Sequence, residues 1–129
     1  MGRTYLNPPD LPTPIGPFSY GVLDDGALYV SGAVGTDEKW NIVGKGDVAA
    51  QTQRAFENVE KVLKAGDCSL ADVVKMNVYL VNASDYKAMN EVRKRVFQPP
   101  YPASTVVVVK ELVLPDLLVE VEVIARRRG

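Results

Sequence analysis

The spacing of apolar residues changes along the chain, and these changes predict its secondary structure. In two segments apolar side chains recur every three or four residues, which is the period of an amphipathic helix. The first predicted helix begins after Asp47, a good N-cap residue, and ends at Gly66; the second begins after Ser84 or Asp85 and ends before Pro99. Segments rich in β-forming residues predict strands at residues 19–22, 27–32, 73–81, 104–112 and 117–126.

The predicted order of elements is therefore β-β-α-β-α-β-β, within one domain that covers residues 1–129. Two amphipathic helices packed on one face of a mixed sheet would form an α+β sandwich. Five prolines make residues 1–17 an extended or turning arm instead of a helix. A hairpin turn is predicted at residues 24–26, and a turn at Pro115-Asp116 is expected to join the last two strands.

The last predicted strand has two chemically different faces. One face is uniformly apolar and should meet the helices; it consists of Val119, Val121, Val123 and Ala125. The other face carries Glu120 and Glu122 between Leu118 and Ile124. Burying a carboxylate is costly unless it is paired or hydrogen-bonded, so this face suggests a lined site, a polar interface or a wet surface. Because helices cover only one side of the sheet, we expect another copy of the chain to cover the other.

Composition narrows the possible chemistry. The 129 residues include 15 Lys and Arg and 16 Asp and Glu, without the clustered basic excess of a nucleic-acid-binding protein. The only cysteine, Cys68, excludes an intramolecular disulfide. The absence of histidine excludes Ser-His-Asp and Cys-His mechanisms and His-ligated metal sites within one chain. With no apolar run near the length of a membrane span and no apolar core of a signal peptide, the expected location is the cytoplasm.

Several short motifs are spread over most of the chain. They are Gly16-Pro17-Phe18-Ser19-Tyr20, Val30-Ser31-Gly32, Gln51-Thr52 with Glu57-Asn58, Asp72-Val73-Val74-Lys75, Met89-Asn90-Glu91-Val92, Pro102-Ala103 and Glu120-Val121-Glu122-Val123-Ile124-Ala125. Their order and spacing resemble the reactive intermediate deaminase (Rid/YjgF) family, also called L-PSP endoribonuclease-like. The resemblance covers the chain from about Gly16 to Arg127.

The resemblance implies a chorismate mutase-like α+β fold that assembles as a homotrimer, with ligands in clefts between the subunits. Enzymatic members of the family hydrolyse enamine or imine intermediates to a keto acid and ammonia. They use neither a cofactor nor a metal, which agrees with the lack of histidine here. The expected partners are thus a small metabolite and further copies of the chain, with no membrane and no nucleic acid.

The resemblance also assigns residues to the cleft, with departures from the family pattern. Glu120 matches the carboxylate that orients the attacking water, and desolvation could raise its pKa. Ser104 stands where deaminating members carry an arginine that grips the substrate carboxylate, and it is expected to face the same cleft as Glu120. Phe18 keeps an aromatic wall without the phenolic hydroxyl, and Val106 stands where a cysteine is common.

Ser31, Gly32 and Asn90 also match positions near the cleft, although Asn90 could equally be a surface or capping amide of a helix. A cation that replaces the missing arginine could be Lys75, Arg3 or an arginine of a neighbouring subunit. Lys110 shares strand parity with Ser104 but lies six residues further, about 20 Å at about 3.3 Å per residue, and is too far away.

Two functions follow from these residues. The first is a cofactor-free enamine or imine deaminase whose substrate differs from that of the arginine-bearing members, as in relatives that are 2-aminomuconate deaminases. The second is a trimer that binds a small metabolite without turnover, which the missing arginine favours. An endoribonuclease gains little support, because the chain has neither a histidine for RNA hydrolysis nor a basic stripe.

Overall fold

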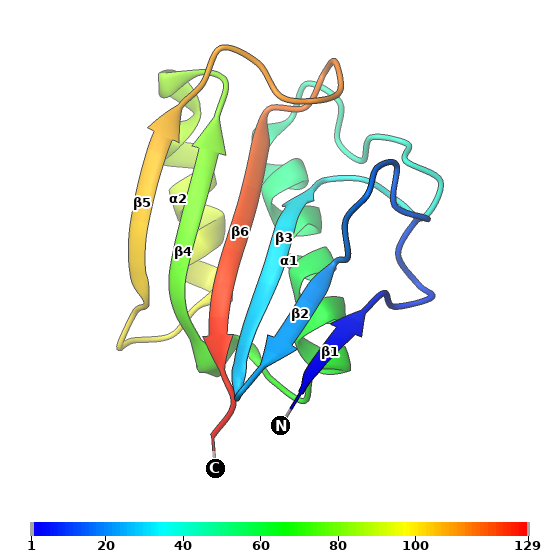
Figure 1. Ribbon diagram of the computed structural model, residues 1–129. Coiled ribbons are helices and arrows are strands. Elements are labelled where there is room, and N and C mark those ends of the chain that lie inside the picture. Colours follow the sequence, from blue (N-terminus) through cyan, green and yellow to red (C-terminus); the bar gives the residue numbers. More distant parts are fainter. Residues whose placement is uncertain (1, 129) are drawn as a thin grey trace.

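A six-stranded β-sheet forms one layer of the protein and two α-helices form the other (Figure 1). The computed structural model describes residues 2–128, so Met1 and Gly129 of the predicted domain lie outside the described residues. The elements are β1 (Arg3–Leu6), β2 (Gly21–Asp24), β3 (Ala27–Val34), α1 (Val48–Ala65), β4 (Val73–Leu80), α2 (Tyr86–Val96), β5 (Ala103–Val108) and β6 (Val119–Arg126). The prediction of an α+β sandwich with a mixed sheet and both helices on one face is confirmed.

The strand order is β1-β2-β3-β6-β4-β5. It includes one strand that the sequence did not predict: Arg3–Leu6, inside the predicted arm, forms β1 and pairs antiparallel with β2. The predicted turn at Pro115-Asp116 lies between the last two strands, but β5 and β6 do not pair, because β4 lies between them. Strand β5 runs parallel to β4, which α2 connects to it, and β5 ends at Val108 instead of residue 112.

Helix α1 begins and ends where its capping residues predict. The Asp47 carboxylate accepts a hydrogen bond from the backbone N–H of Ala50 at 3.1 Å, and the backbone N–H of Gly66 bonds to the last carbonyl groups of the helix. Phe56 and Val59, on the inner side of the helix, are fully buried against the sheet. Burial of this apolar face, about 25 cal/mol per Å² removed from water, holds the helix on the sheet.

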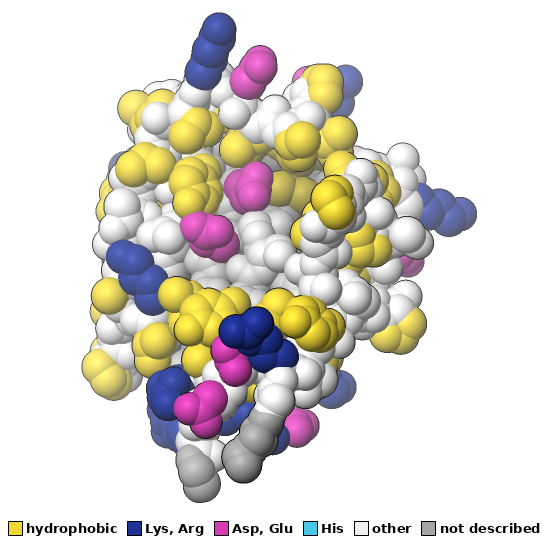
Figure 2. All heavy atoms as spheres, viewed as in Figure 1, with side chains coloured by type: hydrophobic (Ala, Val, Ile, Leu, Met, Phe, Trp, Pro, Cys, Tyr) yellow, Lys and Arg dark blue, Asp and Glu magenta, His cyan; other side chains and the backbone are white. Residues whose placement is uncertain are grey.

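The two faces of β6 differ as predicted. Val119, Val121, Val123 and Ala125 are at most 2% exposed and pack under the helices. On the opposite, open face of the sheet, Glu120 and Glu122 are half-buried. Figure 2 shows this face, with acidic side chains near its middle and hydrophobic side chains around them. The open face is therefore neither a dry core nor an ordinary charged surface.

The arm before β2 is fixed by side-chain bonds to its backbone. Tyr20 Oη donates a hydrogen bond to the Pro12 carbonyl at 2.7 Å, and Trp40 Nε1 donates to the Thr13 carbonyl at 3.1 Å. Replacing Tyr20 with Phe is expected to lower the free energy of unfolding by about 1 kcal/mol, because the buried bond is lost while the ring remains. Urea denaturation measures this, with Tyr29→Phe at a 49% exposed position as the near-neutral control. Equal losses in both variants would contradict a fixed arm.

Candidate functional site

Glu120 lies on the open face of the sheet, next to Tyr79 of β4. Burial, and after it the negative charge of Glu122, raises the pKa of the Glu120 carboxyl, as predicted from the sequence. Glu122 is held differently, because it accepts hydrogen bonds from Asn77 Nδ2 at 3.0 Å and from Tyr79 Oη at 2.5 Å. The Glu120 carboxyl, half-buried and with a raised pKa, is therefore the candidate proton-exchanging group on this face.

The structure brings Gly32 directly under the Glu120 carboxylate. A Cβ atom at residue 32 would overlap the carboxylate oxygen, so only glycine leaves room for Glu120 in this position. The neighbouring Ser31 donates its hydroxyl hydrogen bond to the Ser19 carbonyl at 2.6 Å. That bond ties the segment of Phe18, a 39% exposed ring in edge contact with Tyr20, to the middle of β3. Phe18, Ser31, Gly32 and Glu120 are called the carboxylate half-site below.

The other predicted residues lie on the helix-covered face of the sheet. Ser104 pairs in register with Met76, whose side chain is 1% exposed under the helices, so Ser104 and Val106 point toward α2. Val106 packs against the hydrophobic core. Asn90 projects from α2 toward Ser104, and Arg93 links them: Arg93 Nη1 donates to Ser104 Oγ at 2.8 Å, and Nη2 donates to Asn90 Oδ1 at 2.8 Å. Asn90, Arg93, Ser104 and Val106 are called the arginine half-site below.

Ser104 and Glu120, which are expected to face one cleft between subunits, lie on opposite faces of the sheet within one copy of the chain. Glu120 pairs with Tyr79 and Ser104 pairs with Met76, and successive residues of β4 point to opposite faces. The two half-sites are also separated across the sheet, because β4 lies between β5 and β6. They could contribute to one site only if they came from different copies.

Sequence reasoning missed Arg93 and considered other cations. Arg3 pairs with Asp24 at 3.1 Å at the far edge of the sheet. Lys75 lies on the open face and donates to Thr105 Oγ1, and Lys110 follows the end of β5. The signal that could have identified Arg93 is its spacing: three residues after Asn90 on a helix, it shares that residue's face.

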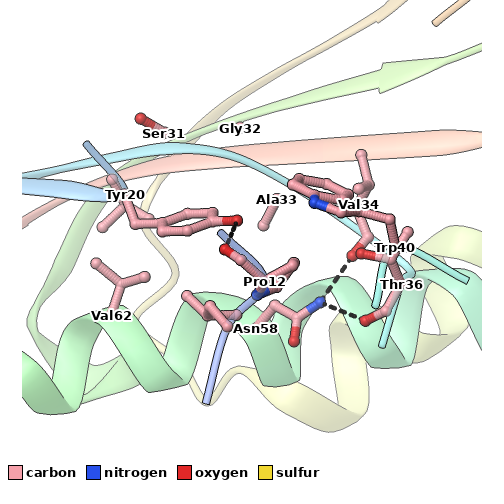
Figure 3. A pocket seen from close by; sticks show the side chains of 12 residues that line it. Pro12, Tyr20, Ser31, Gly32, Ala33, Val34, Thr36, Trp40, Asn58 and Val62 are labelled. Carbon is pink, nitrogen blue, oxygen red and sulfur yellow. Dashed lines mark hydrogen bonds between the residues drawn. The ribbon is translucent and has the colours of Figure 1, made fainter. Parts of the chain in front are cut away.

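A small cavity under Ser31 and Gly32 is shown in Figure 3. Its volume is about 30 Å³, enough for a water molecule but not for a metabolite. Asn58 Nδ2 spans its side by donating to the carbonyls of Val34 and Thr36 at 2.9 and 3.0 Å. This cavity is a packing feature of the junction between α1 and β3.

Residues 2–128 contain no cluster of three or more His, Cys, Asp or Glu side chains that could hold a metal ion. Neither α1 nor any other helix in this range has the length and apolar content to span a membrane.

Comparisons with known proteins agree on one family. The family described as Endoribonuclease L-PSP matches residues 9–127. A 2-iminobutanoate/2-iminopropanoate deaminase of Dermatophagoides farinae is 37% identical over 110 residues, which are 85% of this chain and 86% of that protein. The structure of RidA from an Antarctic Psychrobacter is similar with a TM-score of 0.84 and 35% identity, over 91% and 94% of the two chains. E. coli TdcF, solved with bound serine, gives a TM-score of 0.85 and 32% identity, over 92% and 94%. The chorismate mutase-like fold is thereby confirmed.

Proposed function

The chain belongs to the Endoribonuclease L-PSP family, also called Rid/YjgF, and from this premise we propose that it is a cofactor-free deaminase of small enamine or imine metabolites. The observation that carries the proposal is Glu120, a half-buried carboxyl group with a raised pKa on an open sheet face. A relative with 37% identity is a 2-iminobutanoate/2-iminopropanoate deaminase, which supports this substrate class. The family description also names an endoribonuclease, but a chain without histidine lacks the usual general base for RNA cleavage.

Glu120 would act on water. Its ionised form accepts a proton from a water molecule while the water oxygen bonds to the carbon of the C=N group. The proton then passes to the nitrogen, which gives a carbinolamine with one hydroxyl and one amino group. The carboxyl group next carries the hydroxyl proton to the amino group, so that the C–N bond breaks and ammonia leaves as the carbon becomes a carbonyl. The reaction consumes one water molecule, and Glu120 ends in the ionised form in which it began.

We further propose that the site forms between copies of the chain, in a homotrimer. The carboxylate half-site and the arginine half-site lie on opposite faces of the sheet in one copy. The half-buried and apolar character of the open face supports its being covered by a neighbouring copy. A cleft between copies would bring Glu120 of one copy to Ser104 of the next.

The experiment is to generate a 2-imino acid in solution with an amino-acid oxidase and to follow its hydrolysis with and without the protein. We expect faster release of ammonia and keto acid in the presence of the protein. The alternative function, a trimer that binds a metabolite without turnover, predicts unchanged hydrolysis together with a rise in melting temperature when a ligand binds. A protein that changes neither quantity, with imines of several side chains including 2-aminomuconate, would contradict both functions.

Replacing Gly32 with Ala is expected to abolish this activity with little loss of stability. The added methyl group would displace the Glu120 carboxylate. Overpacking typically costs about 1–3 kcal/mol, and the cost here should lie at the low end because the carboxylate is the end of a flexible side chain. Activity and urea unfolding are measured for Gly32→Ala alone and combined with Glu120→Gln. If Gly32 acts only through Glu120, the double variant is no less active than Glu120→Gln. A fully active Gly32→Ala would show that the position of Glu120 is unimportant.

A further inference from the structure

A second cavity, of about 420 Å³, opens between α2, β4 and the beginning of β5. This volume lies within the range of small-molecule sites. Its apolar wall consists of Met76, Phe97, Tyr101 and Pro102. Its polar side consists of Asn90, Arg93, Lys94 and Ser104. The lining thus has two cations and no acidic side chain, and an anion with an apolar body is complementary to it.

Arg93 is oriented in this cavity by neutral groups alone. Asn90 Oδ1 accepts from Nε at 3.1 Å and from Nη2 at 2.8 Å, and Ser104 Oγ accepts from Nη1 at 2.8 Å. Among residues 2–128, no carboxylate forms an ion pair with Arg93. A guanidinium has five N–H donors. Nη2 also donates to Tyr86 Oη at 3.5 Å, so these bonds leave one donor, on Nη1, for another acceptor. The charge is positioned but not neutralised.

Ser104 completes a two-point anion site. Its oxygen accepts from Arg93, so its own hydrogen is free to be donated. A carboxylate in the cavity can therefore accept one bond from Arg93 Nη1 and one from Ser104 Oγ. Ser104 on β5 and Arg93 on α2 thus present their donors to the same part of the cavity.

We infer that Arg93, assisted by Ser104, binds the carboxylate of the substrate, and that the apolar wall selects a 2-imino acid with a bulky apolar or aromatic side chain. This inference rests on the proposed function for the identity of the ligand. The wall of Phe97, Tyr101 and Met76 gives such a side chain an apolar surface to bury. A three-carbon carboxylate would leave most of the volume to water.

Binding of stable carboxylates tests the inference without turnover. Calorimetry gives the dissociation constants of phenylpyruvate, pyruvate and phenylacetone, the last having the aromatic body without a carboxylate. We expect phenylpyruvate to bind the wild type most tightly. Arg93→Gln should weaken phenylpyruvate binding about tenfold to a hundredfold, the effect of losing a charge-assisted hydrogen bond. Arg93→Lys should fall between, because an ammonium keeps the charge without the planar fork.

The control is Arg95→Gln, two residues further along the same helix, where the exposed arginine has, among residues 2–128, a single side-chain hydrogen bond, to the Glu91 carbonyl. It should leave phenylpyruvate binding unchanged, and Arg93→Gln should leave phenylacetone binding unchanged. Equal phenylpyruvate affinities of wild type and Arg93→Gln, or no binding by the wild type, would overturn the carboxylate contact. Pyruvate binding as tightly as phenylpyruvate would overturn the selection by size. A negative hydrolysis assay alongside Arg93-dependent binding would reject the deaminase but not the carboxylate site.

Discussion

Replacing Glu120 with Gln is expected to lower kcat for imine hydrolysis by about a hundredfold to ten-thousandfold, the usual contribution of a positioned general base. Glutamine keeps the size of the side chain but cannot accept a proton from water at neutral pH. Because Gly32 lies directly under this side chain, the amide should occupy the same space without disturbing the sheet. The loss should therefore appear in kcat more than in KM.

The matched control is Glu122→Gln, two residues along the same strand face. Glu122 is bonded to Asn77 and Tyr79 and is proposed to act only as a neighbouring charge. Its replacement should leave kcat within about tenfold of the wild type, since a change of 1.4 kcal/mol in barrier corresponds to a factor of ten. Equal losses in the two variants would reject Glu120 as the base. An active Glu120→Gln would reject it outright.

The pH dependence has a definite sign. The pKa of Glu120 is higher in the folded protein than in the unfolded chain. Its contribution to the free energy of unfolding is therefore fully present below the unfolded pKa, where the carboxyl group is neutral, and is lost as pH rises through the folded pKa. The ionised form is the base, so kcat/KM should rise over the same range. The free energy of unfolding of the wild type, relative to Glu120→Gln, should fall there. A pH profile of kcat/KM that is flat over this range would contradict the assignment.

The helices and the two faces of the central strands were predictable because their causes are local. Asp47 and Gly66 mark the ends of α1 through bonds to nearby backbone groups. The alternation along β4 and β6 follows from a period of two, and the buried positions agree with it.

The strand that was not predicted and the order of the strands in the sheet have non-local causes. Arg3–Leu6 is mostly exposed and has no alternating pattern, because an edge strand can be held by backbone bonds alone. The turn at Pro115-Asp116 is a local feature, and it does not determine which strand β5 pairs with. Helix α2 connects β4 to β5 as a crossover, and this connection places β5 beside β4 and parallel to it.

Most residues of the candidate site, but not Arg93, could be proposed from the sequence, and their arrangement could not. Glu120 could be identified from a carboxylate on a strand face, and its raised pKa followed from burial. The close approach of Gly32 to Glu120 and the hydrogen bond from Arg93 to Ser104 join different segments of the chain. The spacing of apolar residues along the sequence does not predict such contacts. Whether Ser104 and Glu120 lie on the same face of the sheet depends on strand register, and for Ser104 only the pairing of β5 with β4 fixes that register.

A site shared between copies predicts that two inactive variants restore each other. The first variant is Glu120→Gln, which disables the carboxylate half-site. The second is Ser104→Glu, which places a carboxylate beside Arg93 Nη1, so that the guanidinium pairs with the protein instead of the substrate. When equal amounts are unfolded together and refolded, a site is intact if its carboxylate half comes from the second variant and its arginine half from the first. Random assembly then restores about a quarter of the wild-type activity.

The comparison that decides is between co-refolded and separately refolded mixtures. Separately refolded variants contain only one kind of copy in each oligomer and should stay inactive when pooled. If a single copy contained the whole site, co-refolding would restore nothing, because every copy carries one disabled half. Since Glu120 and Ser104 lie on opposite faces of one sheet, we expect restoration. Its absence, with size-exclusion chromatography showing mixed oligomers of wild-type size, would reject the shared site while leaving the single-variant losses as evidence on each residue.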